Sequence, residues 1–224
     1  MKTILNFLRR LEVNNNKAWF DAHKNDYLEA RSHFYAIVEK LLQGISSFDP
    51  TIKGIGVNDC TYRIYKDMRF SKDGMPYKTH FGAFMARGGR KSGYSGYYFH
   101  IGTGSAEEYP CRSFLAAGNY YTEPKVLKVL REDIELGGGD FDRIIRNLHP
   151  SLSLDQSQKL KRVPSGFDPA GPYIDYIKLK NFCLNADFDD CNLDIEQICE
   201  VFRSCKPFLD YINRAIDFVR EEHV

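Results

Sequence analysis

The chain has 224 residues, 43% of them hydrophobic, so it is long enough to bury a sizeable core. Its 31 basic and 30 acidic side chains leave a formal net charge of +1, which argues against a dedicated nucleic-acid or membrane-surface protein. Because no apolar run approaches the roughly 20 residues of a membrane-spanning helix, we predict no membrane partner and a cytoplasmic location.

Residues 1–47 are predicted to form helices. The three asparagines at 14–16 predict a break followed by a helix N-cap, because asparagine side chains accept hydrogen bonds from free backbone donors. From Trp19 to Ile45 apolar residues recur every three or four positions, which is the pattern of one stripe of a long amphipathic helix, with a kink expected near Asn25.

Residues 57–120 are predicted to be rich in β-structure. Several short segments in this part are dense in aromatic and β-favouring residues, and glycine-containing stretches bound most of them. The stretch GGRKSGYSG suits a hairpin connection and makes its two flanking strands antiparallel neighbours. The predicted strands are residues 60–66, 79–86, 96–102 and 112–117.

Residues 122–224 are predicted to be mainly helical. One helix is expected to end at Gly137–Gly139, and two more near the C-terminus are expected to be separated at Pro207. Helices, then antiparallel strands, then helices indicate an α+β fold: a sheet of about four or more strands packed by helices. We predict a single domain that spans residues 1–224.

The six cysteines contain no C-x-x-C pair. Zinc sites favour such close pairs, and disulfide frameworks favour small secreted domains. We therefore predict buried free thiols in a reducing compartment.

The segment RIYKDMRFSKDGMPYKTH, residues 63–80, concentrates lysine, arginine and aromatic side chains. We predict that it leaves one strand, crosses a loop and enters the next, so that its cations converge on an anionic ligand. The alternative is a solvated loop whose charges pair with one another. The predicted ligand-binding residues are Arg63, Arg69, Lys72, Asp73, Tyr77 and Lys78.

Two histidines lie close to this segment. If the second and third predicted strands pair about their hairpin, His80 faces His100, and Gly82 faces Tyr98 on the same side of the sheet. A slip of one residue would place the histidines on opposite faces.

The predicted catalytic residues are His80, His100 and Asp67, with the histidines as an acid–base pair. The alternative is two separate histidines that are hydrogen-bonded or face solvent. No third histidine, cysteine or carboxylate stands at diagnostic spacing, so we predict no metal site, and the sequence indicates no cofactor.

Three stretches resemble a known family: NNNKAWF near the start, the segment 63–80, and LKRVPSGFDPAGP late in the chain. They are similar to domain-of-unknown-function family 2461, conserved hypothetical proteins found mainly in bacteria, over about Ile4 to Ala215. The resemblance implies one family domain of this length and brings no activity, cofactor or substrate. The chain departs from the family pattern at Lys66, Gly74 and Gly171.

We therefore predict a protein that binds a phosphate- or carboxylate-bearing small molecule in a basic and aromatic cleft, and whether it also acts on this molecule as an enzyme stays open. One alternative is a nucleic-acid-binding module, with Phe70 and Tyr77 stacking on unpaired bases. The other is a structural or interaction protein without a ligand site. The sequence does not indicate an oligomeric state.

Overall fold

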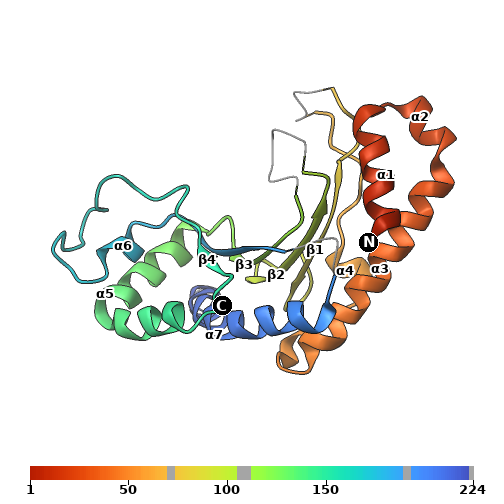
Figure 1. The fold of residues 1–224 in the computed structure, drawn as a ribbon. Coiled ribbons are helices and arrows are strands. Elements are labelled where there is room, and N and C mark those ends of the chain that lie inside the picture. The colour runs from red at the N-terminus through yellow and green to blue at the C-terminus, as the bar shows by residue number, and fades with distance from the viewer. Residues whose placement is uncertain (70–73, 105–111, 189–192, 222–224) are drawn as a thin grey trace. The chain divides into compact units, whose positions relative to one another are not determined.

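The N-terminal segment forms three helices in the computed structural model, which describes residues 1–69, 74–104, 112–188 and 193–221. Figure 1 shows these helices along one side of the first strands. The Asn16 side chain accepts a hydrogen bond from the backbone N–H of Trp19 at 3.0 Å, which confirms the predicted N-cap. The helices are α1 (Lys2–Val13), α2 (Lys17–Ala22) and α3 (Lys24–Ser46).

Five strands form one antiparallel sheet with the order β1-β2-β3-β5-β4. The predicted strands near 79–86, 96–102 and 112–117 are present with nearly the expected bounds, whereas β4 and β5 were not predicted. Helices and sheet together confirm the α+β fold. The strands are β1 (His80–Ala86), β2 (Gly96–Gly102), β3 (Phe114–Asn119), β4 (Ser153–Leu154) and β5 (Phe182–Asp187).

The predicted strand at 60–66 is not a regular strand. The 3-10 helix η1 (Pro50–Ile52) and the short helix α4 (Val57–Cys60) precede it. Residues 61–65 make only isolated bridges, Thr61 to Ala83 and Tyr65 to Tyr77. The segment therefore pairs with β1 at one end and with its own return loop at the other, so no continuous ladder forms.

The helix expected to end at Gly137–Gly139 instead continues. The helix α5 (Pro124–Arg146) passes through the glycines with a kink at Gly137, whose φ and ψ are −141° and 31°. A Cβ atom on Gly138 would lie 2.3 Å from the Tyr173 ring. At this position glycine therefore allows close packing and does not end the helix.

The prediction of two helices separated at Pro207 is also wrong. One helix, α7 (Ile195–Glu221), contains Pro207 in its interior. Cys205 and Phe208, on either side of the proline, have no exposed surface. Their burial stabilises the helical backbone although proline removes one hydrogen-bond donor. The remaining helix is α6 (Ile174–Ile177).

The chain divides into two structural units. The first comprises Met1–Ser92, Tyr98–Leu115 and Asp187–Cys199, and the second comprises Gly93–Tyr97, Ala116–Ala186 and Glu200–Val224. The single domain across residues 1–224 stays a prediction.

The described cysteines are free. Cys60, Cys183 and Cys205 are buried, as predicted, whereas Cys199 is only partly buried. None of the helices in the described ranges combines the length and the apolar character needed to cross a bilayer.

Candidate functional site

The strands β1 and β2 present two chemically different faces. On one face Phe81 and Phe99 pack on Phe34 of α3, with ring centroids 5.2 and 6.0 Å apart. Because side chains alternate along a strand, His80 and His100 lie on the other face. Their ring centroids are 4.5 Å apart, which confirms that the two histidines meet across the strands.

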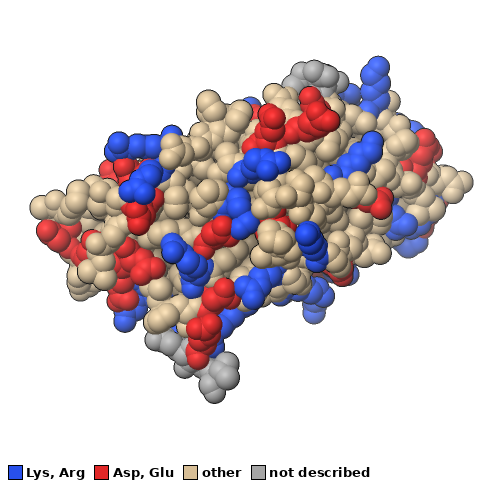
Figure 2. All heavy atoms as spheres, turned by 90° about the horizontal axis from the view of Figure 1, so that it is seen from below, with Lys and Arg blue, Asp and Glu red and all other residues tan. Residues whose placement is uncertain are grey.

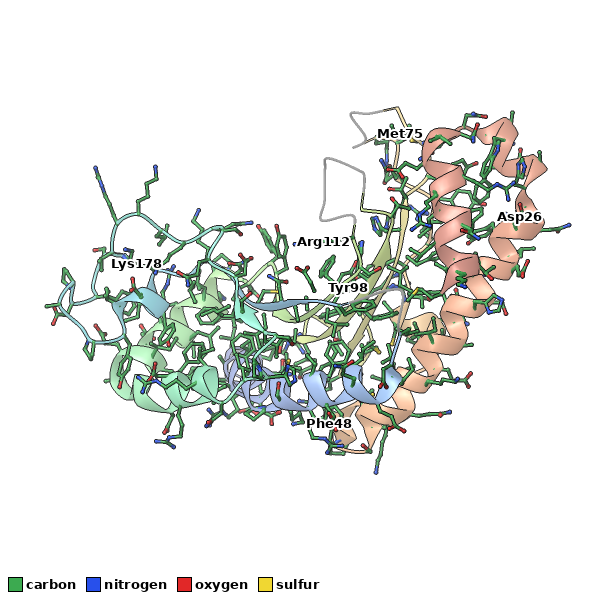
Figure 3. The ribbon with its side chains drawn as sticks, viewed as in Figure 1. Asp26, Phe48, Met75, Tyr98, Arg112 and Lys178 are labelled. Carbon is green, nitrogen blue, oxygen red and sulfur yellow. The ribbon has the colours of Figure 1, made fainter. Side chains whose placement is uncertain are left out.

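Tyr98 lies beside these histidines. A Cβ atom on Gly82 would be 2.6 Å from the Tyr98 hydroxyl oxygen, so the phenol ring lies directly over the glycine, on the same face as predicted. Figure 3 shows Tyr98 on the side of the sheet away from α3. The Tyr98 hydroxyl is 3.0 Å from Nδ1 of His100, a hydrogen bond that fixes the orientation of the imidazole.

His100 is fully buried. Its ring stacks on Phe114, with centroids 4.5 Å apart. Burial, with a smaller contribution from His80, lowers the pKa of His100 to about 3. Its Nε2 atom is buried and has no hydrogen-bond partner among the described residues. His100 is therefore a neutral imidazole at physiological pH with one unsatisfied polar atom.

Two lysines approach the histidines. Burial lowers the pKa of Lys78, and the charges of Arg63 and Lys66 lower it further. Burial likewise lowers the pKa of His80 to about 4, with contributions from Lys78 and Lys66. Among the described residues, the neighbouring charges that shift these two groups are all positive, and such surroundings favour an anion. We call Lys66, Lys78, His80, Tyr98 and His100 the histidine–lysine cluster.

Asp67 and Arg69 form a closed ion pair. Arg69 Nε lies 3.0 Å from one Asp67 oxygen and the terminal nitrogen lies 2.6 Å from the other. These hydrogen bonds hold the pKa of Asp67 below its usual value. For these two residues the structure has the self-paired loop that the sequence left open as an alternative. Lys72 and Asp73 lie outside the described residues.

Tyr77 is placed in the core. Its ring is 4% exposed and stacks on Phe20 with centroids 4.0 Å apart and planes 11° apart. The Asn15 side chain hydrogen-bonds both the backbone N–H and the carbonyl of Tyr77, at 3.1 and 2.9 Å. Tyr77 therefore anchors the central segment next to α2, and we do not include it among the ligand contacts proposed below.

A pocket of about 280 Å³ lies beside the central segment in the first structural unit. Three arginines and four tyrosines line it, with Asn58, Thr61 and Phe81 completing the wall. We call it the arginine pocket and define it by Arg31, Arg63, Arg90, Tyr27, Tyr35, Tyr62 and Tyr65.

The three arginines of the pocket differ in the contacts that they make. The Arg31 guanidinium lies over the Tyr27 and Tyr35 rings, 5.6 and 5.5 Å from their centroids. Arg90 donates to the carbonyl of Asn58 at 2.6 Å. Arg63 is exposed and lines the pocket without a hydrogen bond to another described residue.

No carboxylate lies within ion-pair distance of Arg31, Arg63 or Arg90 in the described part of the chain. Asp67 senses the charge of Arg63 at longer range, but Arg69 already holds that carboxylate. The pocket therefore presents three guanidinium groups whose charge is not neutralised locally, which suits an anionic ligand.

The sequence predicted Arg63 and missed Arg31 and Arg90. Arg31 belongs to a helix and Arg90 to the hairpin connection, so neither is close to the central segment along the chain. One signal was present: Tyr27, Arg31 and Tyr35 are four residues apart, a spacing that places them on one helix face.

Metal ligation has little support in the described residues. They contain no group of three or more histidine, cysteine, aspartate or glutamate side chains arranged to hold a metal ion. His80, which meets His100 across the strands, senses the positive charge of Lys78 and Lys66, and this charge would repel a divalent cation.

Comparison with known families gives one match. Residues 3–211 match the model of a family described as conserved hypothetical protein, DUF2461. No curated protein and no solved structure matches the chain.

Proposed function

Since the chain belongs to DUF2461, a family of conserved hypothetical proteins, and membership brings no activity with it, we propose from the geometry that the arginine pocket binds a small anionic molecule. The ligand bears a phosphate or carboxylate group. The observation that carries this proposal is the convergence of Arg31, Arg63 and Arg90 on one hollow without a described carboxylate partner.

The energetics of charge support this choice. Arg31 and Arg90 are partly buried, so their guanidinium groups have given up part of their hydration. Such groups in proteins are normally paired with an anion or fully hydrogen-bonded. A planar guanidinium donates two parallel hydrogen bonds to a phosphate or a carboxylate, so a bound oxyanion would satisfy the donors that protein groups leave unused.

The tyrosines of the pocket wall indicate the chemistry of the part of the ligand that carries no charge. Tyr35, Tyr62 and Tyr65 offer ring faces for an apolar or aromatic portion and hydroxyl groups for hydrogen bonds. A volume of about 280 Å³ lies near the lower end of ligand pockets, which run from about 300 to 1,000 Å³. We therefore propose a ligand the size of a small organic phosphate or carboxylate.

A nucleic-acid ligand is the alternative. A long polyanion needs a basic face that extends over many phosphates. On the face that Figure 2 shows, lysine and arginine side chains are interspersed with aspartate and glutamate, and the net charge is only +1. The low net charge favours the small anion, and the face drawn in Figure 2 offers no continuous basic surface for a polyanion. A steep fall of oligonucleotide affinity with salt concentration would favour the nucleic acid instead.

The cellular location stays a proposal as well. Four described cysteines are free thiols, three of them buried. Free thiols persist in a reducing compartment, so we propose that the protein acts in the cytoplasm.

Thermal unfolding in the presence of anions tests the proposed function. Inorganic phosphate, sulfate, nucleotides and sugar phosphates are added to the wild type, to Arg63→Gln and to Arg69→Gln. The two arginines belong to the same segment, and only Arg69 is already paired with a carboxylate. We expect at least one anion to raise the melting temperature of the wild type and of Arg69→Gln.

In Arg63→Gln the same stabilisation should need about tenfold more anion, since one charged hydrogen-bonding group is lost. Equal stabilisation of all three proteins would contradict the proposal, as would its absence with every anion.

A further inference from the structure

We propose that the histidine–lysine cluster is a second anion site, which binds a phosphate group on the face of β1 and β2 opposite α3. This goes beyond the proposed function, because the arginine pocket is lined by Phe81, whereas His80 next to it in β1 points to the other face.

The first argument is the charge of Lys78. Its ammonium group is partly buried and lies over the ring of Tyr62, whose centroid is 5.5 Å from Nζ. No carboxylate lies within ion-pair distance of it among the described residues. Burial and the charges of Arg63 and Lys66 both lower the pKa of Lys78 and so oppose its protonated form. A partly buried cation among cations is unfavourable, and an anion bound beside it would reduce that cost.

The second argument is the unsatisfied atom of His100. An unpaired buried polar atom costs about 1–3 kcal/mol. When the Tyr98 hydroxyl donates to Nδ1, the proton of the neutral imidazole resides on Nε2. The imidazole then offers a donor without an acceptor, which is what an oxyanion requires.

The third argument concerns the histidine pair as a whole. Two histidines with ring centroids 4.5 Å apart would also suit a metal ion. Lys78 and Lys66 place positive charge near His80. A metal cation bound to the histidines would be repelled by this charge. The same surroundings attract phosphate, whose charge interacts favourably with both lysines.

Tyr62 borders both proposed sites. Its ring lines the arginine pocket and also lies under the ammonium group of Lys78. Arg63 lines the pocket and acts electrostatically on Lys78. Arg31, on α3, is therefore the better residue with which to disable the pocket alone.

The test uses the nitrogen resonances of the histidine side chains. Long-range proton–nitrogen NMR spectra of the full chain are recorded during titration with inorganic phosphate, and in parallel with acetate. His80→Gln and His100→Gln assign the two signals, and the exposed His33 on α3 serves as an internal control. The titrations are repeated on Lys78→Met, Lys78→Arg and Arg31→Gln.

We expect the His80 and His100 signals of the wild type and of Arg31→Gln to shift saturably with phosphate while His33 stays unchanged. Lys78→Met should weaken the response about tenfold, which is the loss of one charged contact, and Lys78→Arg should restore most of it. Because Arg31→Gln is proposed to impair only the pocket, the two sites can fail independently.

Three results would overturn the second site: no shift of either histidine, an unchanged response in Lys78→Met, or loss of the response in Arg31→Gln. The last would mean that phosphate acts through the pocket. A response to acetate equal to that for phosphate would replace the phosphate group by a carboxylate and so overturn the assignment of ligand class.

Discussion

The arginine pocket and the Asp67–Arg69 pair lie in the same structural unit and both contain guanidinium groups, but among the described residues only Arg69 has a carboxylate partner. Arg69 is 81% exposed along its side chain and both Asp67 oxygens accept its hydrogen bonds. Arg31 and Arg63 have no carboxylate partner among the described residues. The comparison teaches that the neighbours of a charge, rather than the number of charges in a segment, decide whether it can bind.

The largest effect is expected where the central segment is anchored. Tyr77→Ala removes a buried ring that stacks on Phe20, so the free energy of unfolding should fall by about 3 kcal/mol. Urea denaturation measures it. Tyr65→Phe, which changes an exposed pocket tyrosine in the same segment, should stay within about 0.5 kcal/mol of the wild type. Similar losses in both variants would show that anchor and pocket wall cannot be separated.

The next largest effect is expected from acid, which should lower the stability of the fold through His80 and His100 before it acts through Asp67. His80 and His100 have pKa values of about 4 and 3 in the folded protein, against about 6.5 when unfolded. As the pH falls below about 6.5 the unfolded chain binds protons first, so stability decreases with falling pH down to about 4. Asp67 has a lowered pKa, so its contribution is present above the ordinary pKa near 3.8 and lost only below it.

Between pH 7 and pH 5 each of the two histidines should therefore cost about 2 kcal/mol of stability, whereas Asp67 should cost almost none. Melting curves across this range measure the slope. His80→Gln should flatten it, and Asp67→Asn serves as the control that leaves it unchanged. A slope that His80→Gln does not alter would mean that the imidazole is not held neutral.

A smaller effect is expected when Arg31 is replaced by lysine, which keeps the charge but not the planar shape. Arg31→Lys keeps the charge in the arginine pocket and removes the planar fork that lies over Tyr27 and Tyr35. We expect phosphate affinity to fall about five- to tenfold, or about 1 kcal/mol, by isothermal titration calorimetry. The matched Arg10→Lys, at a surface pair with Asp26, should bind like the wild type. Unchanged affinity in Arg31→Lys would show that charge alone suffices.

The smallest effect concerns the paired arginine itself. Asp67→Asn removes the carboxylate that neutralises Arg69. Exposed ion pairs contribute about 0–1 kcal/mol, so stability should change little, while phosphate binding should strengthen by up to about twofold at low salt and not at high salt. A larger gain that persists at high salt would make Arg69 a ligand contact that Asp67 normally occupies.

The sequence predicted correctly those features that depend on residues close together along the chain. The alternation of side chains along β1 and β2, with a glycine-rich connection between them, placed His80 opposite His100 before the rings were located 4.5 Å apart. The asparagine cap of α2 follows equally from a hydrogen bond over three residues.

Features that depend on distant residues were missed. Glycines predict helix ends from their conformational freedom, but at Gly138 the space occupied by Tyr173 decides. Arg31 and Arg90 reach the pocket only because α3 and the hairpin connection fold against the central segment. Asp67 and Arg69 are only two residues apart, and for them the sequence gives both charges but not whether they pair with each other or bind a ligand.

The absence of a side chain at Gly82 determines how Tyr98 is placed on this face of β1 and β2. Its missing side chain leaves the depth in which the Tyr98 phenol lies flat against the strand, and that phenol orients the His100 ring through its hydroxyl. A single methyl group at this position would displace the Tyr98 hydroxyl and so disturb its hydrogen bond to the imidazole. Gly82, the smallest residue of β1, thus controls the hydrogen bond that Tyr98 makes to His100 in β2.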